Sequence, residues 1–424
     1  MIRIIKVTNI DKFVTKILPK QPQKNKTIVE SILKNVKKNG DAAIRKYEKK
    51  FSGANLSSLR LSQSEIKNAY SKVSKTELSA LCLAKDRLEK TESVIQSILK
   101  NKIINNDGVK ISKKFIPIES VGCYIPGGLA QYPSSVIMSV VPAKVAGVKK
   151  VVVVSPPNSH GKIDPLTIVA AKICGADEIY KTGGVQSIAA LSYGTKTISK
   201  VDKIIGPGGV FVTTAKYMIS DQTGIDMLAG PTELGIVADY SANPKFIALD
   251  LISQAEHSND TFCYLITTSE KLAKSVSNII SELITKIQRK NFVKSSLKNN
   301  GFIAICQTKS DMIKLANTLA PEHLQIMVKN PESFSSKITT PGLILLGNNT
   351  PSSASDYILG SNHILPTNGF GKIRGSLSVL DFIKINTQVT CSKSSLSKIS
   401  KYLDILTQDE GLPNHFEAVR GRLQ

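Results

Sequence analysis

The spacing of hydrophobic positions changes once along the chain and divides it into two kinds of structure. Between residues 25 and 104, apolar residues recur three and four positions apart, as in IVESILKNVKKNGDAAIRKYEKKF, and this spacing predicts mostly helices. Before them, residues 1–22 are expected to form a helical N-terminal arm that ends in the stretch from Pro19 to Pro22.

Short continuous apolar runs follow the segment FIPIES, and they alternate with glycine turns and small-residue helical segments. KKVVVVSPP, for example, is an unbroken β-branched run closed by two prolines, and VDKIIGPGG ends in glycines. A second set lies between residues 233 and 377, with expected strands at LGIVADY, TFCYLITTS, GFIAIC and GLILLG and an expected helix through LANTLAPEHLQIMV. Continuous runs separated by helices indicate parallel sheets buried on both faces.

These patterns together predict an α/β fold with two Rossmann-like, incomplete parallel-sheet domains, a helical N-terminal arm and a small helical C-terminal domain. We expect residues 23–123 with 233–377 to form the larger domain, 124–232 the second Rossmann-like domain, and 378–424 the C-terminal domain. Glycine turns at strand carboxyl ends are where such sheets bind ligands. GPGGVF does not match G-x-G-x-x-G, so the turns leave the ligand open.

The composition is that of a soluble globular protein, 41% hydrophobic and 21% charged. The start, MIRIIKVTNIDKF, lacks the apolar core of a secretory signal, and no apolar run approaches the roughly 18 residues of a membrane-spanning helix. We therefore expect a cytoplasmic protein without a membrane partner. The six cysteines lie far apart with no C-x-x-C pair, which favours isolated free thiols.

The formal net charge of +23, from 56 Lys plus Arg against 33 Asp plus Glu, would suit a protein that binds nucleic acid. The lysines are scattered, however, and neither interleaved aromatic residues nor any Trp supplies a stacking platform. A lysine-rich solvated surface is favoured over a specific nucleic-acid site, and weak attraction to polyanions remains the alternative.

The chain has only five histidines, and four of them have a carboxylate or amide nearby in sequence. The fifth, His160, lies in a polar Pro/Gly loop and is expected to be a solvated bystander. Gln254 and His257 are three residues apart, so a helix would place both donors on one face. The alternative is a histidine that only caps the end of a buried helix.

Two further segments suggest acid-base or binding chemistry. Pro321 suits the first turn of a helix, which would put Glu322 and His323 near a positive helix N-terminus. Such a position is plausible for proton transfer, and the alternative is simple charge complementarity at the start of a helix. Asp356 and His363 are embedded among Ser, Gly, Asn and Pro, as in a functional loop.

Imidazole and carboxylate donors suit zinc or a similar transition ion, and no thiolates compete. A set made of Gln254, His257, Asp356 and His415 would leave the metal open to substrate, as catalytic sites do. The set spans about 160 residues and is therefore not a local motif.

Ten motifs, in order, resemble those of the histidinol dehydrogenase family, zinc- and NAD-dependent enzymes that end histidine biosynthesis. The resemblance runs from about residue 25 to the end, and its motifs are GCYIPGG, VPAKVAGV, GGVQSIAAL, KIIGPGG, AGPTE, SQAEH, APEHL, SDYILGSNHILPT, SLSVLDF and EGLPNH. It implies a homodimer in which the C-terminal segment completes the neighbour's active site, with L-histidinol as substrate, NAD+ and one Zn²⁺ per subunit.

The resemblance also implies a role for each matching residue. The implied zinc ligands are Gln254, His257, Asp356 and His415, and the implied acid-base pair is Glu322 and His323. The implied substrate contacts are Thr232, Gln254, His257, His323, Asp356, His363, Glu410 and His415. Residues 124–232 would bind NAD+, with contacts at Tyr124, Gln186 and Gly209.

The sequence departs from the family's pattern at several of its motifs. Gly209 stands where the family usually has asparagine, which removes a side-chain hydrogen bond expected on the cofactor side. Thr232 replaces a usual serine and keeps the hydroxyl, and Ser352 and Ser355 replace a usual Glu and Gly. Two other functions stay open: a related dehydrogenase of another amino or sulfonate alcohol, and a polyanion-binding protein on an inactive enzyme scaffold.

Overall fold

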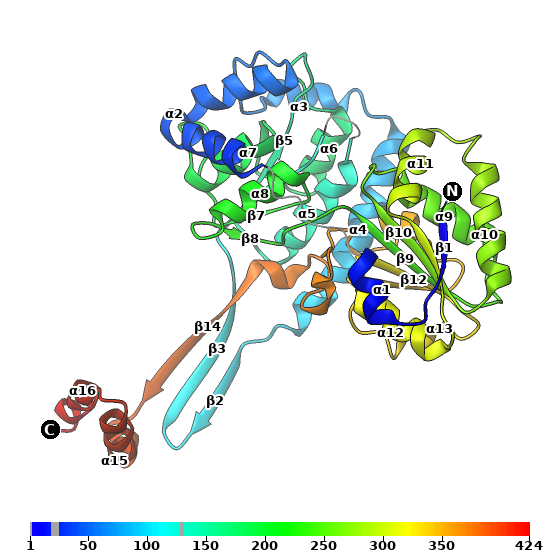
Figure 1. Cartoon of the computed structure of the whole chain (residues 1–424). Coiled ribbons are helices and arrows are strands. Elements are labelled where there is room, and N and C mark those ends of the chain that lie inside the picture. The colour runs from blue at the N-terminus through cyan, green and yellow to red at the C-terminus, as the bar shows by residue number, and fades with distance from the viewer. Residues whose placement is uncertain (1, 18–24, 128–130) are drawn as a thin grey trace.

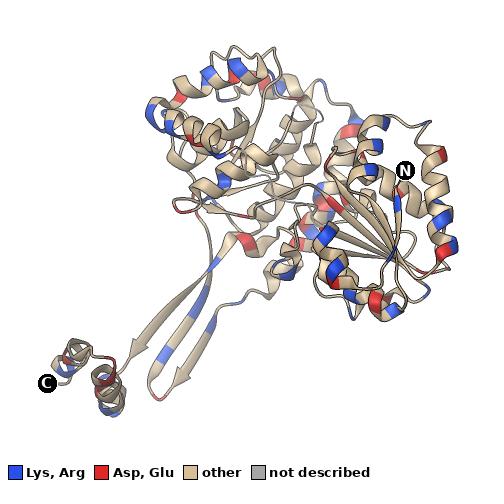
Figure 2. Ribbon diagram, in the orientation of Figure 1, with Lys and Arg blue, Asp and Glu red and all other residues tan. Residues whose placement is uncertain are grey.

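The computed structural model describes residues 2–17, 25–127 and 131–424 and shows two lobes, each built on a parallel sheet, with an arm that extends away from both (Figure 1). The predicted α/β class with two parallel-sheet domains is confirmed. None of the described helices is both long and apolar enough to cross a membrane. Basic and acidic residues are interspersed over the helices of both lobes in the view of Figure 2.

The first lobe contains a five-stranded sheet of order β6-β5-β4-β7-β8. Its strands are β4 (Ser120–Tyr124), β5 (Lys150–Ser155), β6 (Glu178–Lys181), β7 (Lys203–Ile205) and β8 (Gly224–Ile225). In chain order this is 3-2-1-4-5, the Rossmann arrangement without its sixth strand. Helices cover both faces: α5 (Pro133–Val145), α6 (Pro165–Ile173), α7 (Gly184–Tyr193) and α8 (Val210–Ile219).

Strand β5 shows why the apolar runs are unbroken. Val151 and Val153 belong to the core beneath α5 and α6, whereas Val152 and Val154 belong to the core beneath α7 and α8. All four valines are fully buried, because successive side chains of a strand point to opposite faces and both faces are covered.

The second lobe repeats this strand order, with β1 added at one edge beside β11. Its strands are β1 (Arg3–Lys6), β9 (Glu233–Ala238), β10 (Phe262–Thr267), β11 (Phe302–Ile305), β12 (His323–Met327) and β13 (Leu343–Leu346). One face packs on α9 (Pro244–Ala255), α10 (Glu270–Leu283) and α11 (Lys290–Asn299), and the other on α1 (Ile10–Ile17), α12 (Lys309–Leu319) and α13 (Pro331–Ser335). The described part of the N-terminal arm is thus a strand plus a helix, not a helix alone, and residues 18–24 lie outside the described part.

The helical segment that follows the N-terminal arm packs on the first lobe. Helix α2 (Lys26–Ser52) shares a core with α7 and α8, while α3 (Gln63–Tyr70) and α4 (Lys75–Ile98) share the core of α5 and α6. The sequence analysis placed residues 23–123 in the larger domain instead. Helical periodicity identifies the apolar face of a helix but not the surface against which that face packs.

The projecting arm, which extends away from both lobes and is called the arm from here on, is an antiparallel ribbon that carries two helices. Its strands are β2 (Lys102–Asn106), β3 (Val109–Pro117) and β14 (Ile383–Cys391), in the order β14-β3-β2, and its helices are α15 (Lys393–Asp409) and α16 (Pro413–Leu423). The prediction of an all-helical tail was therefore wrong for β14. Its residues Ile383, Ile385, Val389 and Cys391 alternate with polar ones, as in a half-buried strand, but the strand is exposed along nearly its whole length in the single chain.

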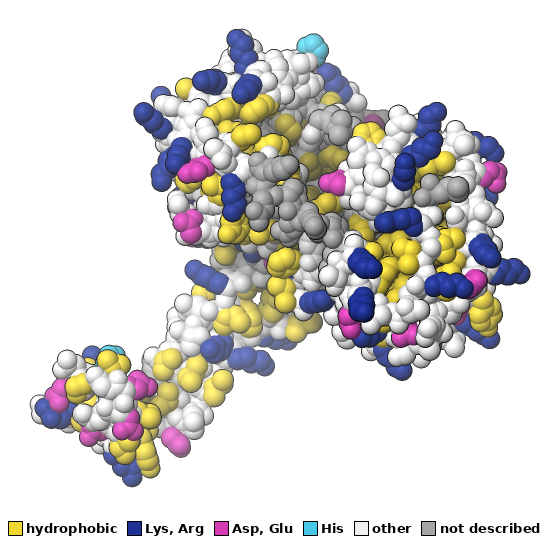
Figure 3. All heavy atoms as spheres, viewed as in Figure 1, with side chains coloured by type: hydrophobic (Ala, Val, Ile, Leu, Met, Phe, Trp, Pro, Cys, Tyr) yellow, Lys and Arg dark blue, Asp and Glu magenta, His cyan; other side chains and the backbone are white. Residues whose placement is uncertain are grey.

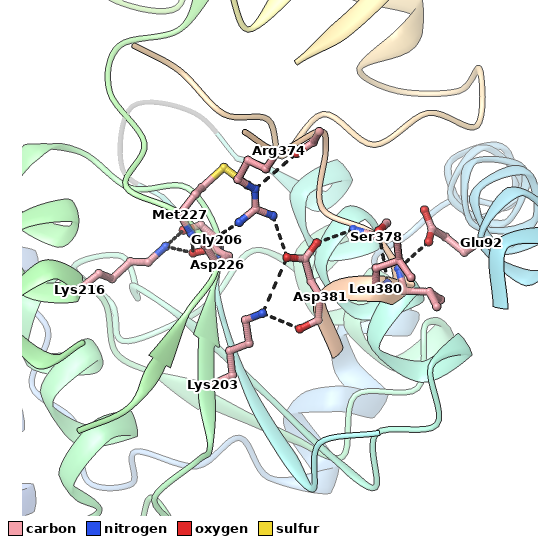
Figure 4. A network of polar contacts seen from close by, with 12 residues as sticks. Glu92, Lys203, Gly206, Lys216, Asp226, Met227, Arg374, Ser378, Leu380 and Asp381 are labelled. Atoms are coloured by element: carbon pink, nitrogen blue, oxygen red, sulfur yellow. Dashed lines mark hydrogen bonds and ion pairs between the residues drawn. The ribbon is translucent and has the colours of Figure 1, made fainter. Parts of the chain in front are cut away.

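A buried ion pair holds the glycine turn that follows β7 (Figure 4). The Asp226 carboxylate accepts hydrogen bonds from the backbone N–H of Gly206 at 2.8 Å and of Met227 at 2.7 Å, and it pairs with Lys216. Lys216 also donates to the Gly206 carbonyl at 3.0 Å, so both polar groups of the glycine are bound.

The same network extends to the base of the arm. Arg374 donates to the Asp226 carbonyl and, at 2.7 Å, to the Asp381 carboxylate. Asp381 lies in the short helix η2 (Val379–Phe382), directly before β14, and it also faces Lys203 of β7. The turn and the arm are thus tied to the same sheet (Figure 4).

We expect Lys216→Met to lower the free energy of unfolding by about 3–5 kcal/mol, because it leaves the Asp226 carboxylate buried without its cation. The control is Lys286→Met at the pair Lys286–Glu282, whose two side chains are each 70% exposed. Loss of such a surface pair should cost at most about 1 kcal/mol. Urea midpoints of both variants test this, and equal midpoints would contradict a stabilising role for the buried pair.

Candidate active site

A cavity of about 280 Å³ lies between the two lobes. Its walls include Gly206 and Pro207, which follow the carboxyl end of β7, and Thr232 and Glu322, which precede the amino ends of β9 and β12. Seven of the predicted site residues line it: Thr232, Gln254, Glu322, His323, His257, Asp356 and His363. Residues that are scattered over 130 positions of sequence therefore face one space.

The helix that carries Gln254 ends before His257 is reached. Helix α9 stops at Ala255, and the His257 N–H bonds to the Gln254 carbonyl at 3.3 Å in the turn that follows. The expectation of one continuous helix through both residues was therefore wrong, although the turn still directs both side chains to the cavity. Desolvation in the cavity lowers the pKa of His257, which favours the neutral imidazole that binds metals.

Glu322 and His323 sit at the start of a strand, not of a helix. Helix α12 ends at Leu319, Ala320 adopts a left-handed conformation with φ of 44°, and β12 begins at His323. The predicted helix N-terminus at Pro321 is thus wrong, because this proline follows a helix end, which is also a common position for it. The run HLQIM is fully buried as an interior strand between β9 and β13.

Local hydrogen bonds, in place of a helix dipole, hold the Glu322 carboxylate. Its Oε2 accepts from the Thr232 hydroxyl at 2.6 Å and from the Glu233 N–H at 2.8 Å. Thr232 in turn accepts from the Gln254 side-chain amide at 2.9 Å. Burial raises the pKa of Glu322, although His323 and these donors oppose the rise. A carboxyl whose burial and hydrogen bonds act in opposite directions is a candidate for proton transfer.

His323 is 2% exposed and donates from Nε2 to the Asp356 carboxylate at 3.0 Å. Burial alone would lower the pKa of His323, but the charges of Asp356 and Glu322 outweigh it and raise the pKa to about 9. Its other nitrogen, Nδ1, is buried without a hydrogen-bond partner among the described residues, 3.8 Å from the Glu322 carboxylate.

His363 is fixed through both ring nitrogens. Nδ1 lies 2.7 Å from the Asp356 backbone carbonyl, which can only accept, so Nδ1 carries the proton. Burial lowers the pKa of His363, and in the neutral ring Nε2 then accepts from the Ser135 hydroxyl at 3.1 Å. The sequence analysis missed Ser135, because a serine in a small-residue helix carries no signal of its own.

A second cavity, of about 1070 Å³, lies at the carboxyl edge of the five-stranded sheet. Tyr124 and Gln186, two of the predicted cofactor contacts, line it, and Pro126 belongs to the walls of both cavities. Buried Glu48 of α2 accepts from the Gln186 amide at 2.8 Å and from the Gly183 N–H at 2.9 Å. Glu48 was also missed, since its helix was assigned to the other domain.

The glycine turn GPGG follows β7 and lines the first cavity with Gly206 and Pro207, whereas Gly209, a predicted cofactor contact, lines neither cavity. Gly206 has φ of 112°, and a Cβ there would lie 2.1 Å from the Tyr124 carbonyl oxygen, so the position requires glycine. Gly209 differs, because a Cβ would meet nothing within 4 Å and the φ of −64° is ordinary. There is room at position 209 for a larger side chain.

The donors that face the first cavity fit zinc in type but not in number. Gln254, His257 and Asp356 offer an amide, an imidazole and a carboxylate, which suit a borderline metal. Within the described residues of one chain, no three His, Cys, Asp or Glu side chains are grouped closely enough to hold a metal ion. With these three donors, the fourth position of a tetrahedral metal would be open to water, substrate or a residue from outside this cavity.

Glu410 and His415, the remaining predicted residues, are not near this cavity. Glu410 caps α15, His415 lies in α16, and both are exposed at the far end of the arm (Figure 1). His160, as expected, is exposed in a loop, and all six cysteines are free. One chain therefore brings together most of the predicted site but not its C-terminal part.

Known proteins are similar to this chain in sequence and in architecture. A family model described as histidinol dehydrogenase matches residues 18–423. The chain is 42% identical over 398 residues to a histidinol dehydrogenase of Methanocaldococcus jannaschii, an alignment that covers 94% of this chain and 92% of the relative. It is 39% identical over 430 residues to that of Clostridium acetobutylicum, which covers 100% and 99%.

The fold has a solved counterpart. The crystal structure of histidinol dehydrogenase from Elizabethkingia anophelis matches with a TM-score of 0.94 at 35% identity, over 100% of this chain and 98% of that one. Sequence and fold thus agree over the whole length, and the chain belongs to the histidinol dehydrogenase family of NAD-dependent oxidoreductases.

Proposed function

We propose that this protein oxidises L-histidinol to L-histidine, the last step of histidine biosynthesis, with two NAD+ and a bound Zn²⁺. The observation that carries the proposal is the convergence of Gln254, His257 and Asp356 with Glu322 and His323 on one cavity. The overall conversion takes one water, reduces two NAD+ and releases three protons. A single site must therefore handle an alcohol and then an aldehyde.

His323 is the base for the alcohol step. Its buried imidazole takes the hydroxyl proton as hydride leaves the same carbon for NAD+, and the product is the aldehyde histidinal. Glu322 then accepts a proton from the water that adds to this aldehyde, and a second hydride transfer gives the carboxylate. Enclosure of the cavity between the lobes keeps the aldehyde from side reactions.

Gln254, His257 and Asp356 would hold the zinc, with His415 as the fourth ligand. When bound, the metal would orient the imidazole and amine of histidinol, both good zinc donors. An imidazole acts as a base only in its neutral form, and a dication on Asp356 would compete with His323 for that carboxylate and lower the pKa of His323 from about 9. The substrate would also contact His363, Thr232 and Glu410.

NAD+ would occupy the second cavity. Tyr124 and Gln186 line that cavity, which lies at the carboxyl edge of a sheet with Rossmann strand order. Pro126 is common to both cavities, so a nicotinamide near it would adjoin the substrate. Asparagine is absent at position 209, so the backbone of the glycine turn has to face the cofactor without that side chain.

The arm would complete the site in a homodimer. Its ribbon and helices carry exposed apolar side chains (Figure 3), among them Ile385, Val389, Tyr402, Ile405 and Leu406. Such a surface on a projecting element indicates a protein partner. A second copy related by two-fold symmetry would receive Glu410 and His415 beside its own Gln254 and His257.

The first test measures NADH formed from a limiting amount of L-histidinol by wild-type protein. We expect two NADH per histidinol, with the rate lost after chelation and restored by Zn²⁺. One NADH per histidinol would contradict the four-electron reaction, and full activity of metal-free protein would contradict the zinc requirement. If histidinol yields no NADH but another amino alcohol is turned over, that alcohol and not histidinol is the substrate.

The second test mixes two inactive variants, His323→Ala and His415→Ala. If His415 serves the partner's site, a mixed dimer has one site with both defects and one intact site, so random mixing restores about a quarter of wild-type activity. The control mixture pairs His323→Ala with Glu322→Gln. Both defects then lie in the same lobe, so no mixed site is intact and activity stays low. Equal activities of the two mixtures would rule out shared sites.

A further inference from the structure

The amino edge of the second sheet holds a buried carboxyl that the proposed mechanism does not use. Glu233 is the first residue of β9, is 5% exposed and does not line either cavity. It therefore has no route to touch substrate or cofactor. A buried carboxyl is costly unless it is hydrogen-bonded, so its position beside the site requires a reason.

Glu233 and Glu322 are bound to each other reciprocally. The Glu233 N–H donates to Glu322 Oε2 at 2.8 Å, and the Glu322 N–H donates to Glu233 Oε2 at 3.1 Å. The pairing of β9 with β12 places the two residues side by side, since their successors Leu234 and His323 are register partners. Each carboxyl thus ties down the backbone from which the other extends.

A third segment joins this pair. Glu233 Oε1 accepts from the Asn368 N–H at 2.9 Å. The preceding residue, Thr367, lines the first cavity and accepts from the Gly230 N–H at 2.6 Å. Both oxygens of Glu233 are therefore engaged, one by each of two backbone donors from different segments.

We propose that Glu233 is a positioning residue for Glu322, which through these reciprocal hydrogen bonds fixes the carboxyl that exchanges a proton in the cavity. Both hydrogen bonds to Glu322 converge on Oε2. No donor among the described residues lies within hydrogen-bonding distance of Oε1, which is left for water or substrate. The inference deepens the proposed function and rests on it.

Electrostatics agree with this role. Burial raises the pKa of Glu233 to about 8, with a contribution from the Glu322 charge and against the effect of the Asn368 N–H. The Glu322 N–H opposes the rise as well, because both backbone donors favour the charged carboxylate. The two donors that position Glu233 therefore also stabilise its charge.

The decisive variant is Glu233→Gln, because an amide has one acceptor oxygen where two N–H donors each require one. One of the donors, from Glu322 or Asn368, must lose its partner. The matched control is Glu92→Gln. Glu92 is also buried, but it accepts only one backbone bond, from Val379 at 2.7 Å, which an amide oxygen can replace.

We expect Glu233→Gln to lower kcat for histidinol by roughly 10- to 100-fold, a part of what general acid-base catalysis contributes, with KM and zinc content little changed. Glu92→Gln should keep wild-type kcat. In a Glu322→Gln background, Glu233→Gln should have no further effect on kcat, because a residue that acts only through Glu322 is silent once that carboxyl is gone.

Two results would overturn the inference: kcat of Glu233→Gln within about twofold of wild type, or an equal loss in the Glu322→Gln background. If Glu233→Gln does not fold, Glu233→Asp is the second variant, because it keeps both oxygens on a side chain that is shorter by one methylene. We again expect no further effect on kcat in the Glu322→Gln background. A failure of the proposed function would appear as absent histidinol turnover in the wild type, whereas a failure of this inference appears only in the variants.

Discussion

The parallel pairing of β9 with β12 is the constraint on which the candidate site depends. It puts Thr232 and Glu233 beside Glu322 and His323, so that one carboxylate oxygen collects a hydroxyl and a backbone N–H. Both strands are interior and, apart from Gln325, apolar beyond their first residues, so a slip by one residue would move Thr232 and Glu233 out of register with Glu322 and His323. The hydrophobic core of the second lobe therefore sets the position of its polar edge.

The two lobes share a strand order but use opposite edges. In the first lobe, the cavity residues follow strand ends, as in Gly206 after β7 and Tyr124 at the end of β4, which is the usual location of ligands in parallel sheets. In the second lobe, Thr232 and Glu322 precede strand starts. A carboxyl edge thus faces an amino edge across the first cavity. Glycine turns approach from one side and ionisable side chains from the other, which suits a reaction between a bound cofactor and a substrate that loses protons.

The sequence predicted which residues would face one cavity better than it predicted the elements that carry them. The unbroken β-branched runs predicted the parallel sheets, because strands buried on both faces leave a strong local pattern. The APEHL segment was placed on a helix, since Pro321 suits a helix start as well as a position after a helix end, and only the pairing with β9 decides between them. Glu48, Ser135 and Glu233 carry no signal in the sequence, because each is hydrogen-bonded to a residue that is distant in sequence, as Glu48 is to Gln186. The roles of Gln254, His257 and Asp356 came from the resemblance, not from spacing.

The arm carries two of the predicted site residues, Glu410 and His415, away from the first cavity. Its ribbon is anchored at the base, where Asp381 binds Arg374 and faces Lys203, and Arg374 also holds the carbonyl of Asp226 in the wall of the first cavity. Beyond that base, apolar side chains stay exposed and His415 is far from the donors that it would join. A rigid base and an uncovered tip are what an element needs if it is to reach into a second copy at a fixed angle. Arg374 contacts both the cavity wall and the base of the arm, so one side chain links the position of the arm to the first cavity.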